Sequence, residues 1–404
     1  MARAVGIYGF ETGHLLSEAN YAPASTGAGN ADQGHIVGNV SIETSIVHSG
    51  SGSLKVAPAS GANGYWSYYS LDSSPSVRFS RMYVRITSLP SSNARLLAGV
   101  GETYGLKINP DGTLTLTHGL APAIVGTTTM ALTDASHWYR IEFDYGIVSD
   151  PAQKLYIDGS LEISNENFGQ SGNFGVFGAK DTVADTYTAY FDDIGYDDSS
   201  LPGAGRVALL VPVSDSARDT LWTGGAGGTT NLWNAVNNIP PIGTSSETDL
   251  TQIEHAGGAA GTTDKYNANM GKPGGAGGYL EAGIGLYSKI NGVQPIICSG
   301  EDASAGDKLL NFINLSNPTT TNVTNSNIGT GALGVFPSNW YSLRAPVLSS
   351  PAIDLKVVPV MTVIRPETAS RVASVCFMGI YVDYTPMGEN SVNVNQAVNR
   401  AAVW

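Results

Sequence analysis

Two adjacent aspartates at the end of a predicted strand are the residues of this sequence best suited to hold a metal ion. The segment YTAYFDDIGYDD begins as a strand at Tyr187 and then reaches Asp192 and Asp193. Carboxylate oxygens are hard ligands of the kind that Ca²⁺ prefers. The alternative is a solvated acidic strand end, whose charges disfavour edge-to-edge aggregation of sheets. The residues alone leave both interpretations open.

A second pair of carboxylates, Glu142 and Asp144, alternates along the predicted strand HWYRIEFDY. Side chains of a strand point to the same face at every second residue, so these two face one side. Glycoside hydrolases use two carboxyl groups that flank the scissile bond. The alternative, which we favour, is the polar face of a sandwich strand.

An aromatic run, YWSYY, offers rings on which sugars could stack. Trp66 and Tyr68 share one face of the predicted strand, and Tyr65 and Tyr69 share the other. At least one of these sets is expected to belong to the core. The run therefore predicts either a glycan-stacking surface or core packing.

The remaining reactive residue types predict no chemistry. The six histidines are scattered, and Cys298 and Cys376 lie in the apolar runs PIICS and ASVCFMGIYV without a CxxC spacing. Two buried, reduced thiols in a protein made in a reducing cytosol are the expected arrangement.

The composition points to many short strands that position these groups. Glycine accounts for 49 of 404 residues and charged residues for 14%, against about 25% in typical domains. The net charge of −13 argues against binding to nucleic acid. No apolar run reaches 18 residues, so we expect no membrane insertion.

The first half predicts an antiparallel sandwich. Pro110-Asp111-Gly112 separates two alternating segments and has the residues of a hairpin turn. In the strand at 77–87, alternation buries one set of residues and leaves Arg81 and Arg85 on the wetter face. About a dozen such strands without a convincing helix predict an all-β domain over residues 1–200.

The Gly- and Pro-containing segment SSLPGAG predicts a hinge to a second β-domain, residues 201–404. A helical turn at 230–237 and a glycine-rich loop at 257–278 are expected, and so are strands at 206–213, 283–290, 294–299, 308–315, 355–364 and 371–384. The last strand is apolar on both faces, which indicates cover by a second sheet or a neighbouring subunit. A terminal arm is expected from about residue 386.

Several short motifs occur together in a familiar order: Gly9-Phe10-Glu11, SGSLKV, GLKINPDGTLTL, HWYRIEFDY, KLYIDG and YFDDI. They resemble the concanavalin A-like (laminin-G-like) lectin and glucanase jelly roll over residues 1–200. The sequel, from YFDDIGYDD through GRVALLVPVSD and LWTGG to DKY, resembles proteins of tailed-bacteriophage structural gene clusters. That family couples such a lectin-like domain to a C-terminal β-domain.

The resemblance implies roles for particular residues. Jelly-roll proteins often hold a structural calcium between the first and last strands, which implies Glu11 with Asp192 or Asp193 as ligands. Glycanases of this superfamily carry Glu-x-Asp-x-x-Glu on one strand, and here Ile147 takes the place of the third carboxylate. A retaining mechanism would lack its acid/base residue, so we expect no enzymatic activity.

The expected function is that of a non-enzymatic virion structural protein, assembled in the host cytoplasm with other virion proteins and with copies of itself. A tail-associated adhesin or minor tail protein, with host-surface glycan as its expected target, is favoured over a capsid decoration or head-fibre protein. A polysaccharide depolymerase is the enzymatic alternative. A free carbohydrate-binding module would need an export signal, and none is recognised in the first residues.

Overall fold

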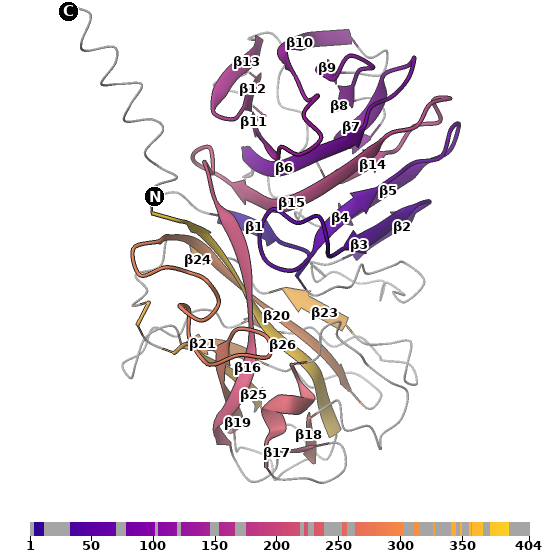
Figure 1. Ribbon diagram of the computed structural model, residues 1–404. Coiled ribbons are helices and arrows are strands. Elements are labelled where there is room, and N and C mark those ends of the chain that lie inside the picture. The colour runs from indigo at the N-terminus through magenta and orange to yellow at the C-terminus, as the bar shows by residue number, and fades with distance from the viewer. Residues whose placement is uncertain are drawn as a thin grey trace, which may run out of the picture. The chain divides into compact units, whose positions relative to one another are not determined.

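The computed structural model describes residues 4–11, 33–69, 78–101, 104–118, 123–145, 153–165, 175–218, 222–224, 230–237, 253–256, 263–301, 310–314, 326–327, 341–344, 348–349, 355–356, 358–366 and 372–387. They belong to two compact units that divide between Gly203 and Ala204. The protein is all-β, as the composition predicts, with antiparallel sheets in both units (Figure 1). The described residues include no helix long and apolar enough to cross a membrane.

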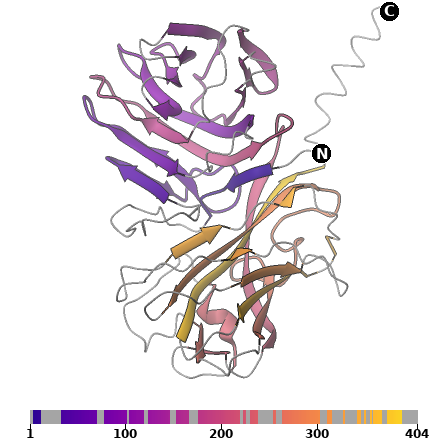
Figure 2. The same ribbon diagram turned by 180° about the vertical axis from the view of Figure 1, so that it is seen from behind.

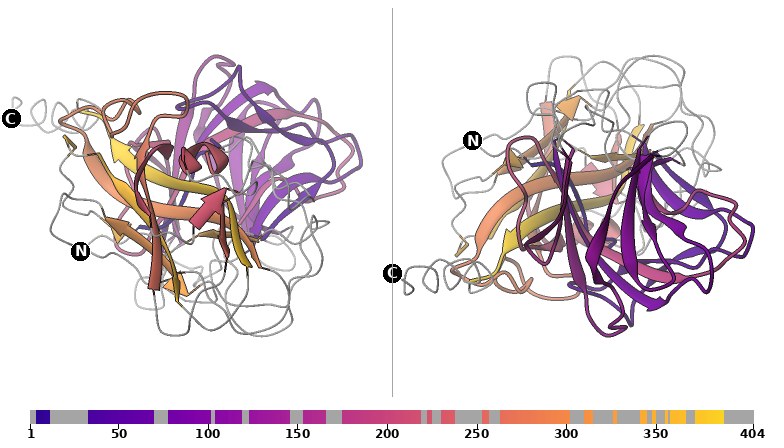
Figure 3. Two further views of the ribbon diagram at one scale, coloured as in Figure 1. Left: turned by 90° about the horizontal axis from the view of Figure 1, so that it is seen from below. Right: turned by 90° about the horizontal axis from the view of Figure 1, so that it is seen from above.

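The first unit contains two sheets. Sheet A joins, in spatial order, β13 (Ser160–Asn165), β12 (Gln153–Ile157), β11 (Tyr139–Asp144), β6 (Phe79–Ser88), β15 (Thr188–Asp197), β4 (Ser53–Val56) and β3 (Val40–Glu43), with β1 (Ala4–Tyr8) paired to β15. Sheet B joins β10 (Ala123–Ala131), β9 (Thr113–His118), β8 (Tyr104–Ile108), β7 (Arg95–Gly101), β14 (Val176–Ala179), β5 (Gly64–Tyr69) and β2 (Gln33–Val37). Figure 2 shows the strands of this unit from behind, and the right-hand view of Figure 3 shows them from above, coloured from indigo to magenta.

Alternation along β6 explains how the core forms. Met82, Val84 and Ile86 point into the apolar cluster that both sheets line, because every second side chain of a strand shares a face. Arg81 and Arg85 point to the opposite side, which we call the outer face of sheet A. This face is drier than the sequence indicates, since Arg81 is fully buried.

The hairpin between β8 and β9 confirms the turn predicted from sequence. The strands pair in register, and Gly112 has a φ of 84°, a left-handed conformation that favours glycine. The side chain of Asp111 accepts a hydrogen bond of 2.9 Å from the backbone N–H of Thr113. Turn chemistry and alternation therefore agree here.

In the second unit, one sheet path runs through β17 (Trp222–Gly224), β18 (Ile253–Ala256), β26 (Val372–Thr385), β16 (Arg206–Arg218), β19 (Thr263–Gly271), β25 (Val360–Pro366), β21 (Leu310–Asn314) and β22 (Ser326–Asn327). Strand β20 (Lys289–Glu301) pairs with β26 and with β23 (Tyr341–Arg344) and β24 (Leu348–Ser349). The predicted helical turn is present as the 3₁₀ helix η2 (Leu232–Ala235).

Two predictions for this unit are wrong. The stretch 257–278, expected to be a loop, contains β19, whose Tyr266, Ala268 and Met270 are buried in the second core. The strand expected at 283–290 begins at Lys289, after a series of turns. The glycines on both sides of β19 favour the prediction of a loop, although the strand itself alternates buried and less buried residues.

Strand β26 is buried on both faces, as its sequence predicts. Met378 and Ile380 belong to the second core, and Phe377 and Tyr381 on the other face are also buried. These side chains are already buried within a single chain. The apolar residues on both faces of β26 therefore do not by themselves require cover by another subunit. The predicted arm after residue 386 lies almost wholly outside the described residues.

Candidate functional site

The end of β1 and a bulge in β15 bring Glu11, Asp192 and Asp193 together. Strand β1 runs antiparallel to β15 with Tyr8 opposite Ile194, so the chain leaving β1 passes the two aspartates. The pairing of β15 with β6 shifts register immediately after Asp192. Asp193 has a φ of 47°, a left-handed conformation that is uncommon among residues other than glycine. We call these three residues the acidic corner.

Donors from the chain segment 48–51 bind the acidic corner. The backbone N–H of His48 donates to Asp192 Oδ2 at 2.8 Å, and the His48 ring Nδ1 lies 2.5 Å from Asp193 Oδ2. Ser51 donates to Glu11 Oε2 through its backbone N–H (2.5 Å) and its hydroxyl (2.8 Å). The other oxygen, Glu11 Oε1, is buried and has no hydrogen-bond partner.

Burial and mutual repulsion make the acidic corner electrostatically costly. All three side chains are almost completely buried. Burial raises the pKa of Glu11 to about 8, against the hydrogen bonds from Ser51, and the charge of Asp193 adds to the rise. Burial, followed by the charges of Asp193 and Glu11, also raises the pKa of Asp192 well above its usual value. A bound cation or bound protons would relieve this repulsion.

The donor set fits a hard cation in part. Among the described residues, no three His, Cys, Asp or Glu side chains form a metal-binding group. The orphaned Glu11 Oε1 nevertheless points at Gly50, where an added Cβ would lie 1.9 Å from this oxygen. Gly50 has a φ of 64° and is exposed. Glu11 is thus positioned as one ligand, and carbonyl or water oxygens would have to complete the coordination.

Glu142 and Asp144, on the outer face of sheet A, both form hydrogen bonds or ion pairs with other residues of the first unit. Arg78 donates to both oxygens of Asp144, at 2.8 and 3.0 Å. Glu142 Oε1 accepts a hydrogen bond of 2.6 Å from the backbone N–H of Gly203, and Arg140 Nε lies 3.0 Å from Glu142 Oε2. Each carboxylate is nearly fully buried, and Ile147 lies outside the described residues.

The segment predicted as a hinge is attached to the same face. Asp197 Oδ1 accepts hydrogen bonds from the backbone N–H groups of Ser199 and Ser200, at 2.8 and 3.1 Å. Gly203 then binds Glu142 through its N–H, and its carbonyl lies 3.4 Å from Arg81 Nη1. The last residues of the first unit therefore lie on sheet A.

The aromatic run maps mainly to packing positions. Trp66 makes edge contacts with Tyr8 and Phe10, at ring distances of 5.7 and 5.3 Å, and is 6% exposed. Tyr65 is also buried, and Lys180 Nζ lies 5.6 Å from the centre of its ring. Neither ring offers a face to a sugar. The side chains of Tyr68 and Tyr69 lie outside the described residues.

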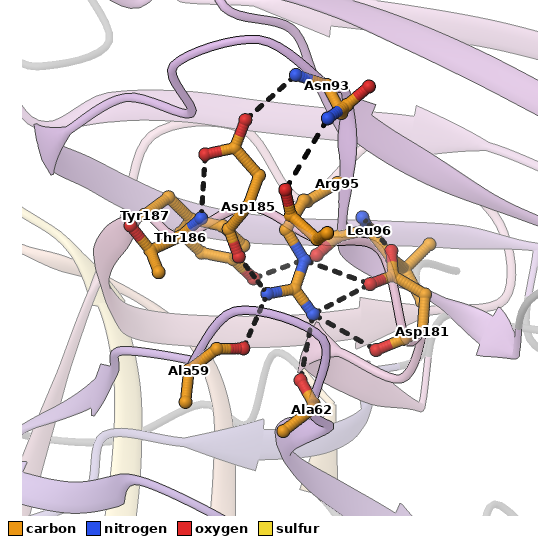
Figure 4. Close-up of polar contacts among 10 residues, drawn as sticks. Ala59, Ala62, Asn93, Arg95, Leu96, Asp181, Asp185, Thr186 and Tyr187 are labelled. Atoms are coloured by element: carbon orange, nitrogen blue, oxygen red, sulfur yellow. Dashed lines mark hydrogen bonds and ion pairs between the residues drawn. The ribbon is translucent and has the colours of Figure 1, made fainter.

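Sequence reasoning missed a buried polar cluster around Arg95 (Figure 4). The Arg95 guanidinium binds Asp181 Oδ1 at 2.8 and 3.0 Å. It also donates to the carbonyl oxygens of Ala59, Ala62 and Asp185.

Asp185 belongs to the same cluster, because its side chain holds the turn that precedes β7. It accepts hydrogen bonds from the backbone N–H groups of Ser91, Ser92 and Asn93, which hold its pKa far below its usual value. Arg95 and Asp185 thus fasten three chain segments together. Polar residues at the loop 181–186 were the one sequence signal for this arrangement.

Comparisons with known proteins identify no family. No family model and no curated protein matches the chain. Similar solved structures include domain 4 of AbnA, an extracellular arabinanase of Geobacillus stearothermophilus solved with arabinotriose, at 18% identity and TM-score 0.35, covering 50% of this chain and 94% of that one. A carbohydrate esterase of the Shiga toxin-encoding bacteriophage phi24B is 12% identical over 42% of this chain and 91% of that one, with TM-score 0.31.

A third similar structure is the binding domain of botulinum neurotoxin DC in complex with SialylT. It is 11% identical over 83% of this chain and 94% of that one, with TM-score 0.33. Of these three neighbours, one holds arabinotriose and one is a carbohydrate esterase. At such low identities and TM-scores, they assign neither a ligand nor a reaction to this chain.

Proposed function

We propose that the protein is a non-enzymatic structural component of a bacteriophage particle, and that its first unit binds glycans of the host surface. Within this proposal it is a tail-associated adhesin or minor tail protein that contacts other virion proteins and further copies of itself. The sequence motifs over residues 1–200, which resemble those of lectin-like jelly rolls, support the glycan-binding part. The phage-like motifs from residue 191 onward support the particle assignment.

The engagement of Glu142 and Asp144 is the observation that carries the non-enzymatic part. A glycosidase needs one carboxyl group that can exchange a proton with the substrate and a second that can reach the sugar or a water. Here Arg78 binds one carboxylate through two hydrogen bonds, and Arg140 and Gly203 flank the other. These contacts are what a structural role requires, and they leave little access for a substrate.

One experiment tests binding and catalysis together. The full-length protein is applied to a panel of isolated bacterial surface polysaccharides, with binding measured by biolayer interferometry and cleavage by release of reducing ends. We expect binding without release. Release of reducing ends would overturn the non-enzymatic assignment.

The identity of the neighbouring genes tests the assignment to a phage particle. Tape-measure and baseplate genes are expected beside the gene for this protein. Portal and major capsid genes would instead indicate a protein of the phage head, and metabolic genes would contradict the proposal.

We further propose that the acidic corner holds a structural Ca²⁺. Glu11 would contribute Oε1, the oxygen that has no hydrogen-bond partner, and Asp192 and Asp193 would contribute negative charge. The ion would join the end of β1 to β15 and neutralise charges that are otherwise costly to bury. It has no part in a reaction, and its expected effect is on stability alone.

A further inference from the structure

Side chains from three neighbouring strands form a row on the outer face of sheet A. Tyr190 of β15 lies opposite Arg85 of β6 on one side and opposite Lys55 of β4 on the other. Residues directly opposite each other in a sheet have side chains on the same face. Arg85 is on the outer face because its neighbours along β6 line the core. Lys55 and Arg85, both partly exposed, therefore flank the ring of Tyr190, which is itself buried.

Trp138 extends this row. It precedes Tyr139, which lies opposite Val84, so continuing the antiparallel register brings Trp138 opposite Arg85. The Nε of Arg85 also donates a hydrogen bond of 2.7 Å to the carbonyl oxygen of Ala135, in the turn that leads to Trp138. We call Lys55, Tyr190, Arg85 and Trp138 the basic-aromatic row.

The indole of Trp138 is held in place and is still partly exposed. The ring of His48 stacks on Tyr83 at 3.7 Å with an interplanar angle of 17°, and it meets Trp138 edge-on at 5.8 Å. The contact between His48 and Asp193 fixes the imidazole. An aromatic ring that needs no rearrangement to receive a ligand loses little conformational entropy on binding.

The two cations of the row differ from most others on this face. Arg78 and Arg140 face carboxylates, whereas Arg85 forms no ion pair within the described part of the chain. Lys55 has a distant carboxylate partner, Glu43, at 3.8 Å, and both side chains are partly exposed. Such an exposed pair contributes little and can exchange partners. A protein of net charge −13 thus displays a local positive site beside an aromatic ring.

We infer that the basic-aromatic row binds an acidic glycan, one whose pyranose rings carry carboxylate groups. A sugar ring would pack against the face of Trp138, because indole presents a large, rigid apolar surface. The guanidinium of Arg85 would receive the carboxylate, since its planar donors match that group in a bidentate manner. Lys55 would add a second, longer-range attraction. This inference rests on the proposed glycan-binding function and names its ligand class and its site.

The test uses the full-length protein and four polymers. Polygalacturonate and polysialic acid carry sugar carboxylates, dextran is neutral, and dextran sulfate is anionic without carboxylates. Affinity gel electrophoresis is expected to show binding to at least one carboxylated polymer and none to dextran. Arg85→Gln and Trp138→Ala should each weaken this binding about tenfold or more, as expected for central contacts of a binding site. Arg85→Lys should lose less, and Lys107→Gln, on the strand β8 of sheet B, should leave affinity unchanged.

Each outcome decides the inference. The proposed site is wrong if Arg85→Gln and Trp138→Ala bind the carboxylated polymers as tightly as the unsubstituted protein does. It is also wrong if the protein binds dextran sulfate as tightly as the carboxylated polymers and Trp138→Ala leaves that binding unchanged, because charge attraction alone would then explain the binding. Should Trp138→Ala not fold, as judged by its melting temperature, Arg85→Gln carries the test. If the protein adheres to bacterial cells but binds neither carboxylated polymer, this inference fails while the proposed function stands. Failure to adhere to cells or to any polysaccharide refutes both.

Discussion

Replacing Arg95 with methionine is expected to destabilise the first unit strongly. The guanidinium of Arg95 is fully buried, and it binds the carboxylate of Asp181 and four backbone carbonyl groups. Methionine has a similar length but no donor, so the variant leaves the charge of Asp181 in the interior, where the backbone N–H of Leu96 still donates a hydrogen bond to it. Removal of one member of a buried ion pair costs about 3–5 kcal/mol.

Calorimetry on the full chain measures this cost. For a unit of this size, each kcal/mol lowers the melting temperature by about 2–4 °C, so we expect a fall of about 10 °C. The second unit does not include Arg95, and its transition should stay in place as an internal reference. A double variant, Arg95→Met with Asp181→Leu, should recover part of the loss, because it removes the unpaired charge as well as its partner.

Arg85→Met is the matched control for this substitution. It makes the same change at an arginine that is partly exposed and that donates a hydrogen bond to the backbone carbonyl of Ala135. Its cost should stay within about 1 kcal/mol. The reasoning is refuted if Arg95→Met lowers the first transition no more than Arg85→Met does, or if both transitions fall together.

The remaining predictions concern the acidic corner, the thiols and association. Millimolar Ca²⁺ should raise the melting temperature of the first unit relative to EDTA, and Glu11→Gln should abolish the difference; coincident curves for the unsubstituted protein would rule calcium out. In EDTA, stability should fall as the pH rises from about 5 towards 8, because folded Glu11, with its pKa raised to about 8, loses a proton that it holds more tightly than the unfolded chain does. Cys298 and Cys376 should resist maleimide in the native protein, and rapid labelling of both would contradict their predicted burial. Light scattering should find residues 1–203 monomeric and 204–404 associated; the reverse result would exclude the assignment of assembly to the second unit.

The elements that sequence predicts well are those whose signals are local. The alternation along β6 and the turn chemistry of Pro110-Asp111-Gly112 both lie within a few residues. The structure confirms which side chains of β6 face the core, although not the exposure of Arg81, and it confirms the turn. Strand β19 shows the limit of the same reasoning. Its alternating Tyr266, Ala268 and Met270 were present in the sequence, but the glycines around them outweighed a signal of three residues.

The roles of charged residues could not be predicted in the same way, because their partners are distant in sequence. Arg78 binds Asp144 across 66 positions, Gly203 binds Glu142 across 61, and Arg95 binds Asp181 across 86. No local spacing encodes such pairs. The acidic corner differs because the resemblance to jelly rolls supplied its grouping, and the structure brings the three residues to one place.

If the first unit binds glycans as proposed, the specificity of the outer face of sheet A would depend on which of its charged side chains lack a partner of opposite charge. At two places on this face an arginine pairs with a buried carboxylate: Arg78 with Asp144, and Arg140 with Glu142. Such pairs fix the packing of the chain over the sheet and leave little charge for a ligand. Arg85 departs from this pattern, because it donates a hydrogen bond to the carbonyl oxygen of Ala135, which orients the guanidinium without neutralising its charge. An oriented cation beside the rigid ring of Trp138 is the combination that carboxylated sugars require, and the row is therefore where recognition by this unit is expected to concentrate.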